Sequence, residues 1–143
     1  MKNVIPEIRQ ISTSETLLIR HKVMWPNRSI AYVELPNDEN GRHFGLFING
    51  KIASVISVFV KNDEAQFRKF ATLIEFQGLG YGSFLLKNII ALLRKEGVRK
   101  LWCNARIGKT EFYEKFNLKP TNKKFKKGGI DYVIMEKIFS DFS

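Results

Sequence analysis

The stretch from Phe70 to Leu86 constrains the fold more than any other part of the chain. Its apolar residues predict a strand up to about Ile74, and the apolar spacing after Ser83 predicts a helix. Glycines at positions 78, 80 and 82 let the backbone between them curl, so that successive amides point into one concavity at the positive end of the helix dipole. The stretch predicts a seat for a pyrophosphate, although glycines of this kind also occur where they only tighten a turn.

Two well-known phosphate loops do not fit this stretch or its surroundings. The dinucleotide fingerprint G-x-G-x-x-G, started at Gly78, requires a glycine where Ser83 stands. Residues 108–110 resemble the end of a Walker A loop, but that loop requires a glycine where Cys103 stands. The sequence therefore excludes a Rossmann dinucleotide site and a P-loop.

Local signals predict the other elements. Ser12 and Glu15 form a capping box that starts a helix, which ends at Pro26. Asn49-Gly50 supplies the two positive-φ residues of a type I′ turn between two strands. Asn117 tolerates the left-handed conformation and ends a short helix. The predicted strands are about 4–11, 43–48, 51–60, 66–74, 98–105 and 130–138, and the predicted helices about 13–25, 83–94 and 109–116.

The order of these elements, β-α-β-β-β-α-β-α-β, predicts an α/β or α+β fold in which helices cover a mixed sheet. Residues 26–42 are rich in Pro, Asn and Gly and predict an irregular loop. The chain has 143 residues, of which 44% are hydrophobic, and shows no repeat or long linker. We therefore expect a single domain over residues 1–143.

Composition also limits the setting of the protein. No apolar run approaches the roughly 18–20 residues that span a bilayer, and the N-terminus lacks the features of a secretory signal. Cys103 is the single cysteine, which excludes an internal disulfide and a cysteine-based zinc site. We expect a cytoplasmic protein without a membrane partner or a metal.

The net charge of +10 is concentrated in the second half of the chain. Residues 1–65 carry 8 basic and 7 acidic side chains, whereas residues 66–143 carry 16 and 7. The lysine segment, residues 119–127, supplies five of these cations and includes Phe125. Such a segment can meet a nucleic acid, an acidic substrate or the phosphates of a cofactor, and it can also be a solvated loop.

Several motifs together indicate a known family. Residues 77–82 fit the pattern Q/R-x-x-G-x-G/A, residues 101–106 form a strand, and residues 112–118 are similar to a helix end F-Y-x-K-x-G-F, with Asn-Leu in place of Gly-Phe. Residues 129–137 look like a closing strand that ends in Met-x-Lys. Over about residues 43–138 the chain thereby resembles the GNAT superfamily of acetyl-CoA-dependent N-acetyltransferases. The resemblance implies a mixed, mostly antiparallel sheet flanked by helices.

The resemblance also implies which residues form the site. Backbone amides of the glycine loop, which we define as Gly78 to Ser83, hold the CoA pyrophosphate, and Gln77 stands at the leading polar position of the motif. The backbone of Phe70, Ala71 and Thr72 binds the pantetheine arm in a slot lined by Asn104. Tyr113 protonates the departing CoA thiolate. The loop residues concerned are Gly78, Leu79, Gly80, Tyr81, Gly82 and Ser83.

The general base is left open by the sequence. The histone-acetyltransferase branch of the family has a glutamate where this chain has Arg68, and arginine cannot accept the amine proton. The possible replacements are His21, Glu34, His43, Glu75 and water. Cys103 is interpreted as a core residue of an apolar strand rather than an acyl-carrying nucleophile.

These observations predict an enzyme that transfers an acetyl group from acetyl-CoA to a primary amine by direct attack in a ternary complex. Two other classes stay open. One is an acyl-CoA-binding module without transferase activity, because Arg68 replaces the expected base. The other is a nucleic-acid-binding domain that uses the lysine segment, which ranks last because no base-reading motif accompanies it. We expect a monomer or a homodimer, and the acceptor is not identified.

Overall fold

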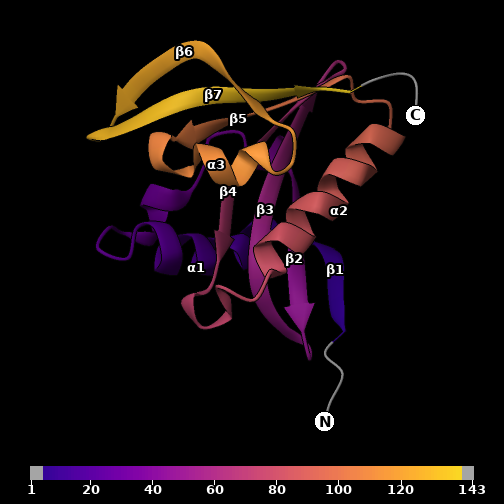
Figure 1. Cartoon of the computed structure of the whole chain (residues 1–143). Coiled ribbons are helices and arrows are strands. Elements are labelled where there is room, and N and C mark those ends of the chain that lie inside the picture. The colour runs from indigo at the N-terminus through magenta and orange to yellow at the C-terminus, as the bar shows by residue number, and fades with distance from the viewer. Residues whose placement is uncertain (1–4, 140–143) are drawn as a thin grey trace. The chain divides into compact units, whose positions relative to one another are not determined.

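The computed structural model describes residues 5–139, which form seven strands and three α-helices (Figure 1). The strands form one sheet in the order β1-β2-β3-β4-β5-β7-β6. β4 runs parallel to β5, whereas β1–β2, β2–β3, β5–β7 and β6–β7 are antiparallel, which confirms the predicted mixed sheet. The strands are β1 (Pro6–Ile11), β2 (Arg42–Ile48), β3 (Lys51–Lys61), β4 (Glu64–Thr72), β5 (Lys100–Arg106), β6 (Lys119–Lys127) and β7 (Ile130–Ile138).

Short helical turns join these strands to the α-helices. The α-helices are α1 (Thr13–Met24), α2 (Tyr81–Lys95) and α3 (Thr110–Glu114). The 3-10 turns are η1 (Ile30–Val33), η2 (Asp38–Asn40), η3 (Ile74–Phe76) and η4 (Ile107–Lys109). By its internal contacts the chain divides into two units. Of the described residues, unit 1 contains 5–59 and 69–89, and unit 2 contains 60–68 and 90–139, so that β3, β4 and α2 each contribute to both units.

The local signals of unit 1 form as predicted. The Ser12 hydroxyl accepts a hydrogen bond from the Glu15 amide, and the Glu15 carboxylate accepts one from the Ser12 amide at 3.0 Å, which completes the capping box of α1. Asn49 and Gly50 have φ values of 51° and 79°, so β2 and β3 meet in the predicted tight hairpin. Residues 26–42, expected to be irregular throughout, contain the turns η1 and η2.

Unit 1 buries the inner face of α1 against its strands. Ile19 of α1 forms a buried cluster with Val55 of β3 and with Ala71 and Leu73 at the end of β4. The partly buried residues packed around them are Ile11, Val23, Met24, Ile52 and Phe76. This packing fixes the end of β4, from which the chain enters the glycine loop.

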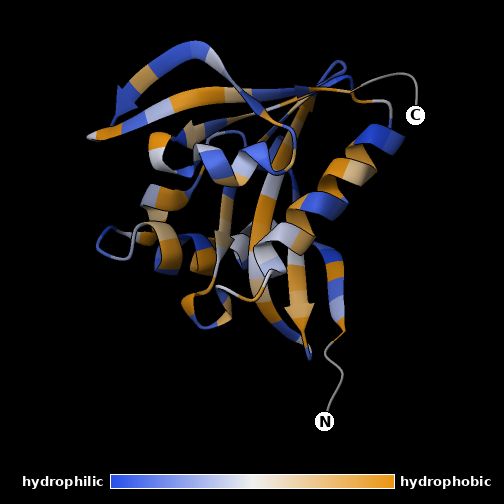
Figure 2. Ribbon diagram, in the orientation of Figure 1, coloured by the Kyte–Doolittle hydropathy of each residue, from blue (hydrophilic) through white to orange (hydrophobic). Residues whose placement is uncertain are grey.

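The helix α2 starts at Tyr81, two residues earlier than predicted, and ends before Gly97, whose φ is 89°. Its buried residues, Leu85, Leu86, Ile89 and Leu93, follow helical spacing, and in Figure 2 hydrophobic and hydrophilic positions alternate along α2. Among the helices of residues 5–139, none combines the length and the apolar character that crossing a membrane requires.

In unit 2, β5 is paired with β7 along its whole length, from Lys100 with Ile138 to Arg106 with Tyr132. Leu101, Cys103 and Ala105 of β5 are buried, while Asn104 between them is exposed, as the alternation of a strand requires. After α3 the chain turns at Asn117, where φ is 66°, so asparagine takes the left-handed position as predicted.

The lysine segment is not a loop but the strand β6, which corrects the sequence interpretation. β6 lies at the edge of the sheet, is paired with β7 alone in the strand order, and is mostly blue in Figure 2. Its register shifts between Pro120 and Lys124. A run of lysines with one phenylalanine lacks the β-branched residues that mark strands, and lysines are typical of edge strands because they oppose edge-to-edge aggregation.

Candidate active site

Gly78 and Gly80 give the glycine loop of unit 1 its shape. Their φ values are 76° and 83°, a conformation that costs any residue with a Cβ about 1–2 kcal/mol. A Cβ at either position would have no heavy atom within 4 Å. The space beside both residues is therefore open, and a ligand can approach the backbone there.

Gly82 serves a different purpose, which is close packing. A Cβ on Gly82 would lie 3.1 Å from the Thr72 hydroxyl oxygen and 3.4 Å from the Phe70 ring. The first turn of α2 therefore packs directly on the end of β4. Gln77 strengthens the same junction, because its side-chain amide donates a hydrogen bond of 2.8 Å to the Thr72 carbonyl.

The glycine loop leads into the N-terminus of α2, a helix of 15 residues. Phe84 N–H donates to the Gly80 carbonyl at 3.0 Å, so the amides of residues 81–83 come before the first helical hydrogen bond. Such amides carry partial positive charge and favour an anion. No lysine or arginine occurs between Leu73 and Leu86, so within this segment the donors for an anion are backbone amides and neutral side chains.

The three β4 residues predicted to bind pantetheine lie just before this loop. The Ala71 carbonyl accepts a hydrogen bond from the Ser54 hydroxyl at 3.0 Å, and the Thr72 hydroxyl lies 2.9 Å from that of Ser54. Leu73 N–H donates to the Ala53 carbonyl at 2.9 Å. Hydrogen bonds from β3 therefore hold the end of β4 at the residues where the sequence places the pantetheine arm.

In unit 2, Tyr113 lies on α3 in an aromatic cluster. Its ring centroid is 5.7 Å from that of Phe67 and 5.2 Å from that of Phe112. Burial raises the pKa of Tyr113 and the neighbouring Cys103 adds to this rise, whereas the charge of Arg106 opposes it. The phenol therefore keeps its proton at neutral pH, as a proton donor must.

Cys103 and Asn104 are neighbours on β5 with opposite surroundings. Burial raises the pKa of the Cys103 thiol to about 12, which agrees with a core residue and leaves almost no thiolate for nucleophilic attack. Asn104 is exposed and lies opposite Ile134 of β7. The parallel register of β4 and β5 ends with Gln66 and Trp102, so Asn104 lies two residues past the last of these pairs.

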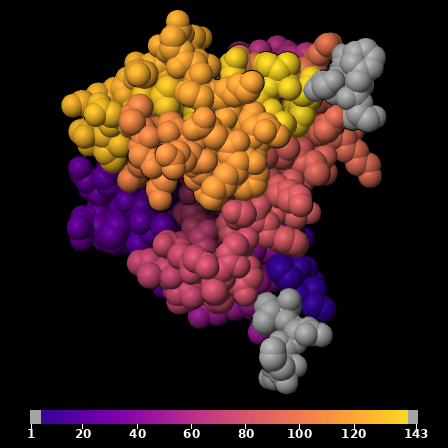
Figure 3. Space-filling model, in the orientation of Figure 1, coloured from indigo at the N-terminus to yellow at the C-terminus, as the bar shows by residue number. Residues whose placement is uncertain are grey.

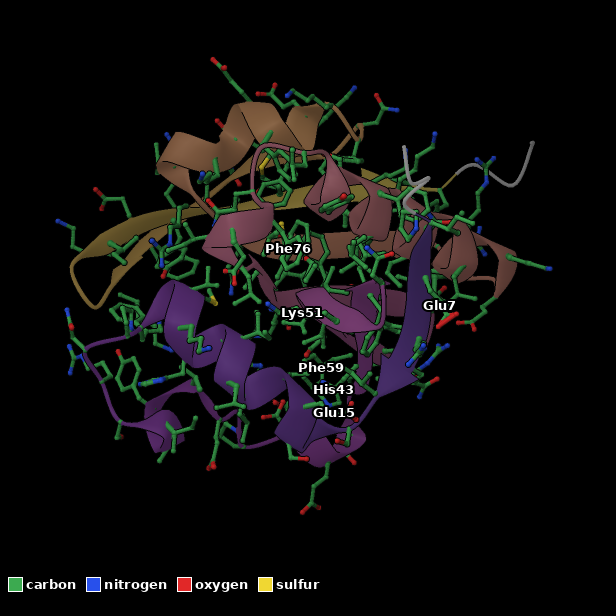
Figure 4. All side chains as sticks on the ribbon, turned by 90° about the horizontal axis from the view of Figure 1, so that it is seen from below. Glu7, Glu15, His43, Lys51, Phe59 and Phe76 are labelled. Carbon is green, nitrogen blue, oxygen red and sulfur yellow. The ribbon has the colours of Figure 1, made fainter. Side chains whose placement is uncertain are left out.

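The two histidines considered as general bases are engaged in structural contacts. His43 is buried, with Nδ1 2.7 Å from the Ser57 hydroxyl and Nε2 2.9 Å from the Asp38 carbonyl, and its ring lies next to Phe59 (Figure 4). His21 Nε2 lies 2.6 Å from the Arg28 carbonyl.

The acidic alternatives are exposed. Glu34 is exposed at the end of η1. Glu75 is exposed and lies 3.9 Å from the ammonium group of Lys51, whose side chain points toward Phe76 in Figure 4. Arg68, at the position of the family's glutamate, is partly buried on β4.

A buried ion pair in unit 1 was not found from the sequence. Arg20 of α1 is fully buried and binds Asp38 through two hydrogen bonds of 2.9 Å. It also donates to the Val33 carbonyl at 3.0 Å and to the Ser57 hydroxyl at 2.9 Å. These contacts tie α1 to residues 33–38. Arg20 lies four residues after the buried Thr16, on the same face of α1.

Comparison with known proteins decides the family. Residues 20–139 match the model of the acetyltransferase (GNAT) domain. The chain belongs to the GNAT acetyltransferase family. Membership confirms the predicted enzyme class, an N-acetyltransferase with acetyl-CoA as its cosubstrate.

Individual relatives agree with this assignment. The uncharacterized N-acetyltransferase YitI of Bacillus subtilis (strain 168) is 30% identical over 141 residues, which covers 92% of this chain and 95% of that protein. The ribosomal-protein-S18-alanine N-acetyltransferase of Escherichia coli has the same fold, with a TM-score of 0.79, 24% identity and 97% of each chain covered. A GNAT family acetyltransferase from Elizabethkingia anophelis, solved with acetyl-CoA bound, has a TM-score of 0.73 at 15% identity and covers 97% of this chain and 100% of its own.

Proposed function

We propose that this GNAT enzyme transfers the acetyl group of acetyl-CoA to a primary amine of a small molecule or peptide, directly within a ternary complex. The observation that carries the proposal is the glycine loop. Gly78 and Gly80 are left-handed and have open space where a Cβ would be, and the first amides of α2 follow them. This combination suits a pyrophosphate, because the anion can reach several fixed amides without meeting a side chain.

The remaining contacts to acetyl-CoA are proposed residue by residue. In unit 1, Gln77 fixes the entry to the loop through its bond to Thr72, and the backbone of residues 70–72 binds the pantetheine arm. In unit 2, Asn104 is the proposed contact to acetyl-CoA, and its amide side chain is exposed. Leu79, Tyr81 and Ser83 contribute their backbone amides to the pyrophosphate seat.

Tyr113 is the proposed general acid. The neutral amine attacks the thioester carbonyl, a nitrogen–carbon bond forms, and the carbon–sulfur bond then breaks. The Tyr113 hydroxyl gives its proton to the departing sulfur, and the proton released by the amine restores the phenol through water. The phenol is protonated at neutral pH, and the developing thiolate, a stronger base than the thioester sulfur, accepts its proton.

Water is the proposed acceptor of the amine proton. His43 is buried and both of its ring nitrogens are within hydrogen-bond distance of protein oxygens, and His21 is bound to the Arg28 carbonyl. Arg68 cannot act as a base. An enzyme of this kind works best on amines that are already neutral, so we expect its rate to rise with pH up to the pKa of the acceptor amine.

The test is release of free CoA from acetyl-CoA in the presence of amines, followed with a thiol reagent. The panel contains polyamines, amino acids, aminoglycosides and peptides with free N-termini. Cys103 does not disturb this readout, because it is buried and its pKa is raised to about 12. Amine-dependent thiol release with formation of the acetylated amine supports the proposal. Tight CoA binding with no transfer to any amine overturns it in favour of an acyl-CoA-binding module.

A further inference from the structure

The hairpin of β6 and β7 in unit 2 carries a surface pocket that the proposed cofactor contacts do not use. Its volume is about 370 Å³, and known small-molecule sites range over roughly 300–1,000 Å³. Figure 3 shows β6, in orange, at the surface of the molecule. We call this the hairpin pocket, and it is lined by Ile107, Lys124, Phe125, Lys126, Asp131 and Tyr132.

The lining combines a flat aromatic surface with free positive charge. Phe125 and Tyr132 are cross-strand partners whose rings stack with centroids 5.2 Å apart and planes 15° apart. Phe125 remains 37% exposed, so one face of the stack is open to a ligand. Lys126 lies 3.8 Å from Asp131 in a solvent-exposed pair, and Lys124 forms no ion pair within residues 5–139. The pocket therefore has more positive than negative charge.

Strand register connects the hairpin pocket to the proposed acid. Tyr132 is paired with Phe125 on one side and with Arg106 of β5 on the other, so these three side chains lie in one row on the same face. The positive charge of Arg106 also acts on Tyr113, where it opposes part of the rise in pKa that burial causes. The chain between the hairpin pocket and Tyr113 is short, because Ile107 of the pocket belongs to η4, which leads directly into α3.

We propose that the hairpin pocket binds an anionic group, a carboxylate or a phosphate, of the amine acceptor. Lys124 and Lys126 supply the charge, and Phe125 and Tyr132 supply an apolar contact to the rest of the acceptor. This inference rests on the proposed function. The CoA pyrophosphate has a different proposed seat, the backbone amides of the glycine loop, so we assign the hairpin pocket to an anionic group of the acceptor.

The experiment uses matched amines that differ in one anionic group, tested on the CoA-saturated full-length protein. The pairs are O-phosphoethanolamine with ethanolamine, β-alanine with its amide, and a tripeptide containing one glutamate with its glutamine counterpart. Backbone amide NMR shifts of residues 124–126 and 131–132 in the CoA-saturated protein report binding, and thiol release from acetyl-CoA, in a separate assay without added CoA, reports transfer. We expect at least one anionic amine to shift these signals with a Kd at least 10-fold lower than that of its neutral partner. Whether the preferred amine carries a phosphate or a carboxylate shows which of these anions the pocket binds.

Two double variants locate the effect. The double variant Lys124→Gln with Lys126→Gln should lose the preference for the anionic amine. The double variant Lys119→Gln with Lys123→Gln removes the same charge from β6 outside the pocket, and it should keep this preference. Equal affinity for both partners, equal loss in both double variants, or no shift with any anionic amine overturns the proposal. A random single-stranded oligonucleotide that shifts the hairpin signals and displaces the anionic amines also overturns it.

The two proposals fail in different ways. Transfer to amines without any preference for an anionic partner overturns the acceptor pocket and leaves the acetyltransferase mechanism in place. Binding of an anionic amine to the hairpin without transfer of the acetyl group overturns the mechanism and leaves the pocket in place.

Discussion

The glycine loop of unit 1 and the β6–β7 hairpin of unit 2 are both suited to anions, but by different means. The loop offers backbone amides at the start of α2, with two left-handed glycines and no basic side chain. The hairpin offers lysines on an exposed edge strand. Fixed amides recognise the shape of an anion, whereas mobile lysines supply charge with little geometric demand. The first arrangement suits a constant cofactor, and the second suits an acceptor.

The two units also use their charged side chains differently. In unit 1, Arg20 is fully buried and hydrogen-bonded to Asp38, which is 6% exposed. In unit 2, Lys126 and Asp131 form a solvent-exposed pair. A buried charge without its partner is costly, whereas an exposed one is solvated. We therefore expect removal of charge to reduce stability in unit 1 and ligand binding in unit 2.

The largest expected effect follows from a negative charge in the glycine loop. Gly80→Asp places a carboxylate where the pyrophosphate is proposed to bind, and we expect no detectable CoA binding by calorimetry. The control is Gly50→Asp in the β2–β3 turn, because Gly50 has a φ of 79° and similar open space. It incurs the same backbone strain and should bind CoA normally. CoA affinity of Gly80→Asp equal to that of the control would contradict the proposed seat.

Removal of Arg20 should have the next largest effect. Arg20→Met leaves the Asp38 carboxylate buried without its partner, and we expect a loss of about 3–5 kcal/mol in the free energy of unfolding, measured by urea denaturation. Lys126→Gln, the exposed counterpart, should change this free energy by no more than about 0.5 kcal/mol. Equal losses in the two variants would remove the distinction between the units.

The same ion pair predicts how stability depends on pH. Burial acts to raise the pKa of Asp38, but the hydrogen bonds from Arg20 and from the Leu35 amide, with the charge of Arg20, outweigh it and lower the pKa. A carboxyl with a lowered pKa in the folded state stabilises the fold above its unfolded value of roughly 3.9. This stabilisation is lost as the pH falls below about 4. The free energy of unfolding of Asp38→Asn should therefore fall less than that of the unsubstituted protein over the same pH range.

Tyr113→Phe should lower turnover by about 10²-fold and leave acetyl-CoA affinity nearly unchanged. The substitution keeps the ring in its contacts with Phe67 and Phe112 and removes only the proton donor. Phe112→Leu is a packing control that retains the hydroxyl of Tyr113. A loss of turnover below threefold, measured where chemistry limits the rate, would mean that water protonates the sulfur.

The smallest expected effect is that of salt. The lysines of the hairpin are exposed, so salt weakens their attraction for an anion, and it screens charges more than about 8 Å apart at 0.15 M ionic strength. We expect the preference for an anionic acceptor to fall severalfold between low and physiological salt, and CoA affinity to fall less, because the loop amides contact their anion directly. Isothermal titrations at two salt concentrations measure both. A steeper salt dependence for CoA than for the acceptor would mean that the lysines bind the cofactor.

The parts of the fold that sequence predicted are those decided by neighbouring residues. The capping box of Ser12 and Glu15, the turn at Asn49-Gly50 and the left-handed Asn117 each depend on a few adjacent positions. The same is true of the glycine loop, whose backbone conformation is set by its own glycines.

The parts that sequence did not predict depend on distant partners. β6 is a strand because β7 pairs with it, although lysines disfavour strands. The burial of Arg20 was not predicted, because Asp38 and Ser57, which bind it, lie 18 and 37 residues away in the chain. The structural contacts of His43 were not predicted either, because its partners Ser57 and Asp38 are not adjacent to it in the chain. His43 was therefore considered as a base.

The most direct test of the account is a map of CoA on the backbone by amide NMR. CoA is titrated into the full-length protein, and the shift of every assigned amide is followed. The account predicts that the largest shifts occur at residues 78–83, with little change at residues 119–127. The largest shifts in the lysine segment, with the glycine loop unchanged, would contradict it, because the cofactor would then be held by side-chain charge rather than by the amides at the start of α2.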